Sequence, residues 1–326
     1  MCVSNRKVSH DQAEVNLPAA GPNVAILLCT HNGARFLREQ LDSIANQSYA
    51  NWAISVSDDG STDATRSVLH GFQGDFGQHR LNITSGPAVG SAANFILLVC
   101  SPKITADYYA FADQDDVWER DKLTRSLAWL QAVPSEVPAL YCSRTQYIGE
   151  NGSFLGFSKL FERTPTFRNA VIQSIAGGNT MVFNQSAREL FAKTPPDVKV
   201  VAHDWWSYML ITGCGGRVFY DPVPTVRYRQ HGNNIVGQNT TVGARISRAK
   251  ALMTGRFKSW NEINLHALNR MRPYLTSDSQ MALDTFIRSR KKILPARLLG
   301  LWRSGIYRQT SIDNIGLFLA ATLNKL

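Results

Sequence analysis

The chain has 326 residues, 44% of them hydrophobic and 18% charged, which is typical of a globular protein and excludes a disordered or fibrous one. Its five cysteines are odd in number and lack CxxC spacing, so neither a disulfide framework nor a zinc site follows. No stretch reaches the roughly 18 to 20 apolar residues that span a bilayer. The first twenty residues lack the apolar core of a secretory signal, and we expect a disordered lead-in over residues 1–22.

The net charge of +10 is concentrated near the C-terminus. Residues 1–240 carry 20 Lys and Arg against 21 Asp and Glu, whereas residues 241–326 carry 15 against 4. We expect a basic helical lobe over residues 239–326, either simply solvated or associated with an anionic membrane surface, which attracts each basic side chain by about 1 kcal/mol. Because no RNA- or DNA-binding motif accompanies the charge, we expect no nucleic acid partner.

Three short apolar runs in the first part of the chain each end in a polar loop. Residues 24–29, 52–57 and 108–112 form these runs. A helix is predicted after the first run by the spacing of Phe36, Leu37, Leu41 and Ile44. Another is predicted after the second, with capping side chains from Ser61-Thr62-Asp63. This alternation predicts an α/β fold with a doubly wound, mostly parallel sheet, whose ligands bind beyond the strand ends.

Further along the chain the elements are less regular. Residues 139–142 are a strand candidate, and Gly177-Gly178-Asn179 interrupts the chain before residues 180–183. Beyond Gln238 the sequence becomes helical, and a rough apolar stripe is predicted there, formed by Phe286, Ile287, Ile293, Leu294, Leu298, Leu301 and Trp302.

The segment Asp113-Gln114-Asp115-Asp116 places dense negative charge at the end of the third predicted strand. A divalent cation would neutralise it, and carboxylate oxygens suit Mg²⁺ or Mn²⁺. The alternative is an acidic helix start ahead of Val117-Trp118, stabilised by the helix dipole, in which Asp116 is only a cap.

The loop Ser57 to Asp63 follows the second strand. A carboxylate at such a strand end can accept hydrogen bonds from a base or ribose, although an Asp-Gly turn before a capping Ser or Thr has the same pattern. The chain contains neither GxGxxG nor GxxxxGK[ST], so neither glycine-rich phosphate cradle is present. We therefore expect a metal to handle the phosphates.

Two later segments also carry candidate chemistry. In His203-Asp204-Trp205-Trp206 the aromatic neighbours can desolvate Asp204 and raise its pKa toward that of a general base; a capping Asp before a helix is the alternative. Residues 227–234 join Arg227, Arg229 and His231 in a loop that can grip phosphates or complete a metal shell. An exposed basic loop is the alternative for this segment.

Together these segments, in this order over residues 23–238, resemble family 2 glycosyltransferases of the GT-A fold. The resemblance is strongest to the bacterial cell-surface polysaccharide branch that includes rhamnosyltransferases. It implies a GT-A catalytic domain over residues 23–238, followed by a C-terminal basic helical extension. The family's usual acidic pair at the base motif is His203-Asp204 here, so its role falls on Asp204 alone.

The resemblance also implies roles for individual residues. Asp204 takes the position of the catalytic base, Asp115 of a metal ligand and His231 of a group that completes the metal or diphosphate site. The implied nucleotide-sugar contacts are Thr30, Asn32, Arg35, Asp58, Asp113 and Arg229. The implied acceptor side is formed by Gly178, Asn179 and Trp205.

The implied activity is an inverting sugar transfer from a nucleoside-diphosphate sugar, with L-rhamnose from dTDP-rhamnose as the preferred donor and a UDP-hexose as the alternative. The acceptor is expected to be a saccharide or a lipid-linked saccharide, and the cofactor Mg²⁺ or Mn²⁺. A nucleotide-sugar nucleotidyltransferase and a non-catalytic scaffold with the same fold are the other readings. We expect a cytoplasmic protein, peripheral on the inner face of the cytoplasmic membrane if the basic lobe binds lipid.

Overall fold

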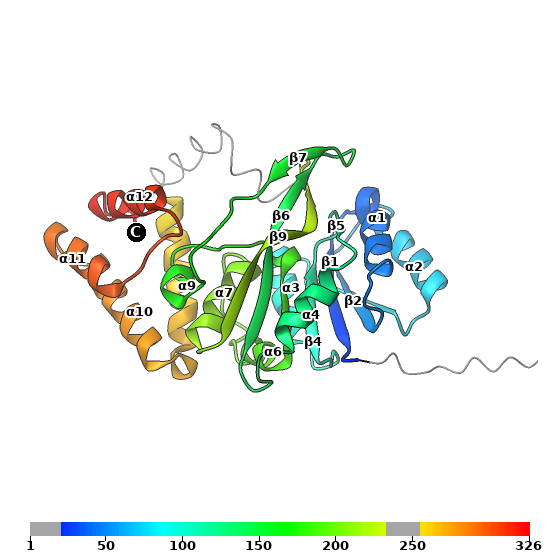
Figure 1. Cartoon of the computed structure of the whole chain (residues 1–326), viewed down its shortest axis with the longest axis horizontal. Coiled ribbons are helices and arrows are strands. Elements are labelled where there is room, and N and C mark those ends of the chain that lie inside the picture. Colours follow the sequence, from blue (N-terminus) through cyan, green and yellow to red (C-terminus); the bar gives the residue numbers. More distant parts are fainter. Residues whose placement is uncertain (1–20, 233–254) are drawn as a thin grey trace, which may run out of the picture.

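The computed structural model describes residues 21–232 and 255–326. Most of the predicted lead-in over residues 1–22 lies outside these ranges, as does the predicted domain boundary at residues 238 and 239. Within them the chain forms one nine-stranded sheet with helices against it (Figure 1).

The first part of the chain builds the parallel half of the sheet. The fully buried strand β1 lies between β2 and β4, and β3 continues beyond β2. Burial on both faces is what a continuous apolar run such as residues 24–29 favours. The three predicted strands and the two predicted helices are confirmed. The bounds are β1 (Val24–Thr30), α1 (Ala34–Ala45), β2 (Trp52–Asp58), α2 (Thr65–Phe76), β3 (Leu81–Ser85), α3 (Ser91–Cys100) and β4 (Tyr108–Ala112).

Antiparallel pairs enter on the other side of β4. There β8 pairs with β4, β6 pairs with β8, β9 runs parallel to β6 and antiparallel to β5, and β7 extends from the edge of β6. This mixed half brings the end of β9 beside the segment that follows β4. The bounds are β5 (Val117–Trp118), β6 (Ala139–Ile148), β7 (Phe154–Phe157), β8 (Val182–Asn184) and β9 (Arg217–Arg229).

One helix of the central region matters most for the site. Almost all of α7 (His203–Gly213) is buried, because apolar residues occupy nearly its whole circumference. A short 3-10 helix, Gly178–Thr180, contacts β4 and β6 nearby. The other helices here are α4 (Lys122–Leu130), α5 (Phe167–Ala170) and α6 (Gln185–Ala192).

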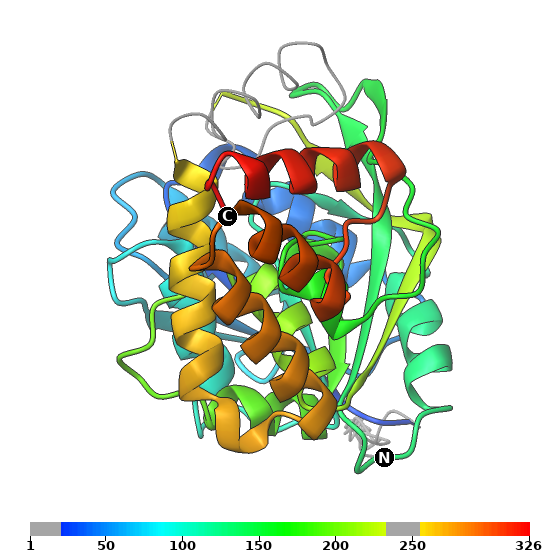
Figure 2. The ribbon, with the colours of Figure 1, turned by 90° about the vertical axis from the view of Figure 1, so that its left-hand side faces the viewer.

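The chain ends in a helical lobe, seen face-on in Figure 2. A single buried cluster joins Leu27 of β1 and Trp206 of α7 to Leu268 and Leu317 of this lobe, so the lobe and the sheet share one core. No described helix is long and apolar enough to cross a membrane. The lobe consists of α9 (Arg256–Arg270), a 3-10 turn (Arg272–Tyr274), α10 (Ser277–Arg290), α11 (Leu294–Ser304) and α12 (Ser311–Thr322).

The apolar stripe predicted for residues 286–302 is divided between two helices. Phe286 of α10 and Leu301 of α11 are buried, whereas Ile293 and Trp302 are exposed. The stripe therefore does not face the core as a whole, because the chain turns between α10 and α11.

Candidate active site

The polar loops after β1, β2 and β4 meet at one edge of the sheet, as predicted. The parallel register pairs Thr30 with Asp58 and Leu28 with Ala112, so the three strands end side by side. The hydroxyl of Thr30 donates to Oδ1 of Asp58 at 2.8 Å, and both residues are buried. The hydroxyl of Ser61 donates to the same oxygen at 2.5 Å. These two hydrogen bonds hold the carboxylate of Asp58 at the C-terminal end of β2.

The loop after β1 is fastened to the loop after β2. Asn32 adopts a left-handed backbone conformation with φ 48°, and its side-chain oxygen accepts from the amide of Thr62 at 2.8 Å. The carboxylate of Asp63 accepts from the amide of Ala34 at 3.1 Å and from that of Thr65 at 3.0 Å, so it ties the starts of α1 and α2 together.

Gln114 fastens the loop after β4 to the loop after β1. Its side-chain oxygen accepts from the amide of His31 at 2.8 Å, and its side-chain nitrogen donates to the carbonyl of His31 at 2.9 Å. A Cβ atom on Gly33 would lie 2.1 Å from that side-chain oxygen. A side chain at Gly33 would therefore displace Gln114 from its hydrogen bonds to His31.

Three carboxylates gather where β4 ends and α7 begins. Burial, together with the charges of Asp115 and Asp204, raises the pKa of Asp113 to about 7. Burial also raises the pKa of Asp204 to about 6, against hydrogen bonds from the backbone amides of Trp205 and of Asp204 itself. This upward shift is in the direction that the sequence predicts for Asp204. Neighbouring carboxylates repel one another when all are ionised, so a cation or a bound proton among these three is favoured.

Asp115 and His231 form the pair best suited to hold a metal. Oδ2 of Asp115 lies 2.7 Å from Nε2 of His231. Among residues 21–232 and 255–326, no three His, Cys, Asp or Glu side chains form a complete metal site. One carboxylate and one imidazole nevertheless fit an ion that keeps waters and takes its remaining oxygens from substrate phosphates.

Asp116 is not a helix cap, and that alternative is wrong because Val117–Trp118 is a strand. Its fully buried carboxylate accepts from the side-chain nitrogen of Asn179 at 2.5 Å and from the amide of Arg229 at 3.1 Å. Burial lowers the pKa of Lys122, which is buried nearby, to about 7 against the raising effect of Asp116. Asp116 therefore joins the loop after β4 to the 3-10 helix and to β9.

The predicted basic loop at residues 227–234 is a strand as far as Arg229, and Arg229 is buried. The guanidinium of Arg229 donates to the carbonyls of Asp115 and Glu150 at 3.0 and 2.9 Å and pairs with the carboxylate of Glu39 at 2.5 Å. Arg227 pairs with Glu119 at 2.7 Å. The contact of Arg229 with the nucleotide sugar stays a prediction, while its observed contacts position the segment that carries Asp115.

Three predicted acceptor-side residues lie around the start of α7. A Cβ atom on Gly178 would lie 2.1 Å from Nε2 of His203, so this glycine lets the 3-10 helix approach α7. Asn179 is buried with its amide directed at Asp116. The indole nitrogen of Trp205 donates to the carbonyl of Ala170 at 2.7 Å, which turns the ring toward the core and α9.

The first turn of α1 carries Arg35 to the rim of the site. Its guanidinium pairs with Glu150 of the turn between β6 and β7 at 2.7 Å, and both side chains are exposed. Sequence reasoning assigned no role to Asp59, yet its carboxylate accepts from the amides of Ala88 and Gly90 at 2.6 and 2.9 Å. No local pattern in the sequence indicates these contacts, because Ala88 and Gly90 are 29 and 31 residues away from Asp59.

The sequence model of Glycosyl transferase family 2 matches residues 25–191. The dTDP-rhamnosyl transferase RfbG of Shigella flexneri is 30% identical over 235 residues, which cover 68% of this chain and 77% of RfbG. The UDP-Glc:alpha-D-GlcNAc-diphosphoundecaprenol beta-1,3-glucosyltransferase WfgD of Escherichia coli is 32% identical over 111 residues, which cover 33% of this chain and 40% of WfgD.

Solved structures resemble the whole fold. The mannosyltransferase PcManGT from Pyrobaculum calidifontis, solved with GDP-Man and Mn²⁺, has a TM-score of 0.50 and 19% identity, covering 93% of this chain and 86% of that one. Residues 1–349 of S. aureus TarS, solved with UDP-GlcNAc, have a TM-score of 0.52 and 14% identity. The match covers 93% of this chain and 89% of that one.

The chain belongs to glycosyl transferase family 2. It is a glycosyltransferase with the GT-A fold, which confirms the predicted family and fold and disfavours the nucleotidyltransferase and scaffold readings.

Proposed function

We propose that this glycosyltransferase moves L-rhamnose from dTDP-rhamnose, with inversion, onto a saccharide or lipid-linked acceptor in cell-surface polysaccharide synthesis such as that of O antigen or capsule. Its similarity to RfbG, named a dTDP-rhamnosyl transferase, supports this donor. The observation that carries the mechanism is the position of Asp204: a carboxylate in the first turn of α7, with a pKa raised to about 6, close enough to Asp113 to raise that residue's pKa.

In the proposed step the acceptor hydroxyl oxygen attacks the anomeric carbon of the donor sugar as the bond from that carbon to the diphosphate oxygen breaks. Asp204 takes the hydroxyl proton, and the diphosphate leaves with the bonding electron pair. A carboxylate with a pKa of about 6 is ionised at neutral pH and is more basic than an ordinary aspartate. Attack from the side opposite the leaving group inverts the anomeric configuration.

The nucleotide is proposed to lie along the ends of β1 and β2. Thr30, Asn32 and Asp58 line these ends, and Asp58 already accepts two hydroxyl hydrogen bonds, so its carboxylate is fixed for a base or ribose. Asp113 directly follows β4, the strand beside β1, and the charge of Asp204 raises its pKa. Arg35, exposed at the rim, is placed to contact the charged part of the donor.

Asp115 and His231 are the residues proposed to hold Mg²⁺ or Mn²⁺. An ion held there would neutralise the negative charge that develops on the leaving diphosphate. The donor set fits this role, and a structural neighbour, PcManGT, was solved with Mn²⁺ and GDP-Man. Arg229 positions the backbone of Asp115 through its hydrogen bond to that carbonyl.

The acceptor is proposed to approach along the 3-10 helix and the start of α7, where Gly178, Asn179 and Trp205 lie. WfgD is named for an acceptor on diphosphoundecaprenol, which supports a lipid-linked acceptor for this chain. We propose that the enzyme meets it from the cytoplasm, on the inner face of the cytoplasmic membrane.

A donor screen tests this proposal. Purified protein with Mn²⁺ is melted with dTDP-rhamnose, UDP-glucose, UDP-GlcNAc and GDP-mannose, because a ligand that binds only the folded state at about 100 times its Kd adds about 2.7 kcal/mol of stability. We expect stabilisation by dTDP-rhamnose, and a product whose anomeric configuration, measured by NMR, is inverted. If only a UDP-hexose stabilises the protein, dTDP-rhamnose is not the donor. A UDP-hexose is the second candidate because WfgD is named for UDP-Glc.

A further inference from the structure

The last helix of the chain is apolar on two faces. Leu317 and Ala320 of α12 are buried against the lobe, yet Ile312, Ile315 and Leu319 on its other side are 81%, 70% and 51% exposed. A helix that is hydrophobic all round is ordinarily covered on all sides. The outer face of α12 is thus prepared for a second apolar contact.

The strand β7 continues this exposed apolar surface. Phe154 and Phe157 are exposed, and their rings lie 5.2 Å apart in an edge-to-face arrangement. Lys159, two residues after β7, pairs with Asp313 in the first turn of α12 at 2.7 Å, and this pair joins the two elements. Both elements lie at the upper end of the molecule in Figures 1 and 2. We call this surface the apolar face; it consists of Phe154, Phe157, Ile312, Ile315, Leu319 and Leu323.

The apolar face begins beside the site. The turn that leads into β7 carries Glu150, whose carboxylate pairs with Arg35 in the first turn of α1 at 2.7 Å. Its carbonyl accepts from the guanidinium of Arg229 at 2.9 Å. Whatever covers the apolar face therefore also approaches the rim where donor and acceptor enter.

The charge of the lobe decides what kind of partner fits. Residues 255–326 contain twelve Lys and Arg against four Asp and Glu. Lys291 and Lys292 are exposed between α10 and α11, and neither is in a salt bridge with a described residue. The guanidinium of Arg297, in α11, donates both to the carbonyl of Lys292 and to that of Ala321 near the end of α12, so the turn that carries these lysines lies beside the end of α12. A second copy of the chain would bring like charge against like charge, whereas an anionic bilayer supplies both an apolar layer and the opposite charge.

We propose that the apolar face of β7 and α12 docks on an anionic lipid bilayer, with Phe154, Ile315 and Leu319 entering the headgroup boundary and the lysines beside them contacting lipid phosphates. Interfacial binding of this kind combines buried apolar area with attraction to anionic lipid. The inference deepens the proposed function, since docking would hold the rim of the site at the surface where a lipid-linked acceptor resides.

Vesicle binding of the full chain tests the proposal. The protein is sedimented with phosphatidylcholine vesicles, with and without about 30% phosphatidylglycerol, and in about 1 M salt, where the Debye length is about 3 Å. We expect binding to the anionic vesicles only, reduced by salt. The double variant Ile315→Gln/Leu319→Gln and the single variant Phe154→Thr should each lower the partition coefficient, the former by about tenfold or more.

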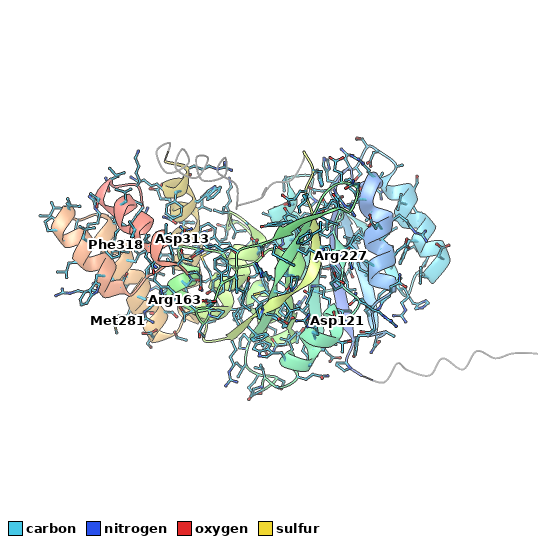
Figure 3. The ribbon with its side chains drawn as sticks, turned by 45° about the horizontal axis from the view of Figure 1, so that its top comes forward. Asp121, Arg163, Arg227, Met281, Asp313 and Phe318 are labelled. Carbon is cyan, nitrogen blue, oxygen red and sulfur yellow. The ribbon has the colours of Figure 1, made fainter. Side chains whose placement is uncertain are left out.

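The matched control is Met281→Gln, which removes an equally exposed apolar side chain from α10 on another side of the lobe. Figure 3 shows Met281 apart from Phe318 and Asp313 of α12. Circular dichroism melts of all variants establish that they are folded. Binding is measured without donor, so its absence would leave glycosyl transfer intact and would refute the docking alone.

Two further outcomes would overturn the inference. Anionic vesicle binding that the three apolar substitutions leave unchanged would show that basic charge alone attracts the bilayer. A dimer in light scattering that Ile315→Gln/Leu319→Gln converts to a monomer would assign the apolar face to a second copy of the chain.

Discussion

Nε2 of His231 lies 2.7 Å from Oδ2 of Asp115, although 116 residues separate the two in the chain. The first follows β9 and the second follows β4, and the buried guanidinium of Arg229 fixes their distance by donating to the carbonyl of Asp115. In the proposed function, this carboxylate and this imidazole would hold a cation that also binds a diphosphate. The antiparallel half of the sheet thus completes a site that the parallel half begins.

Replacing Asp115 should remove metal-dependent donor binding. In Asp115→Ala we expect the Mn²⁺-dependent affinity for dTDP to collapse in isothermal titration calorimetry, because the only carboxylate of the pair is lost. His231→Ala should weaken it by about 10 to 100 fold. Asp75→Ala, which removes an exposed carboxylate paired with Arg38, is the control. Unchanged calorimetric binding by Asp115→Ala would refute its role as a ligand.

Replacing Asp204 should separate turnover from binding. Asp204→Asn keeps the shape of the side chain but cannot take a proton, so we expect kcat to fall by about 10² to 10⁴ fold while the donor Kd stays within about twofold. Single-turnover assays and calorimetry measure the two quantities. Asp197→Asn, at an exposed aspartate paired with Arg270, should leave both unchanged. Equal losses in binding and turnover would assign Asp204 to the donor site instead.

The same residue predicts how stability depends on pH. Burial raises the pKa of Asp204 to about 6 from an ordinary value of 3.8. The folded chain therefore holds this proton more tightly than the unfolded chain, and the associated stability is full below about pH 4 and lost as pH rises through about 6. Without ligand, Asp204→Asn should melt at a higher temperature than the natural sequence near pH 8 and at the same temperature near pH 4. Equal melting temperatures at both pH values would mean that water solvates the carboxylate fully.

The rate of transfer should depend on the same ionisation of Asp204, but it should rise with pH where the stability falls. A base with a pKa of about 6 is active only when deprotonated, so kcat/KM should fall about tenfold for each pH unit below that value. A pH profile on a saccharide acceptor measures this limb. A rate that stays constant down to about pH 4 would contradict the assignment of Asp204 as the base.

Much of the parallel half could be predicted because each strand is short, apolar and followed by polar residues. Thr30, Asp58 and Asp113 each stand at or directly after a strand end, and parallel strands bring such ends together. The strand β3 and the helix α3 were not predicted. Residues 81–85 of β3 are mostly polar or exposed, because this strand lies at the edge of the sheet.

Other features depend on contacts between distant segments. Asp116 resembles a helix cap locally, and only its bonds to Asn179 and Arg229 show that it holds the base of the site. Trp205 stands next to Asp204 in sequence, yet adjacent residues on a helix point about 100° apart, so its ring enters the core. Sequence spacing alone carries neither fact.

Gly178 should be intolerant of any side chain. A Cβ atom there would lie 2.1 Å from Nε2 of His203, and that ring stacks on Phe95 with centroids 4.0 Å apart, so it cannot turn away. We expect Gly178→Ala to lower the free energy of unfolding by about 1 to 3 kcal/mol and, by shifting the start of α7 and with it Asp204, to lower kcat. Gly71→Ala, where nothing lies within 4 Å, should instead add about 0.5 to 1 kcal/mol in urea unfolding. If Gly178→Ala unfolds at the same urea concentration as the natural sequence and keeps its kcat, the 3-10 helix does not pack against α7 as closely as the structure shows.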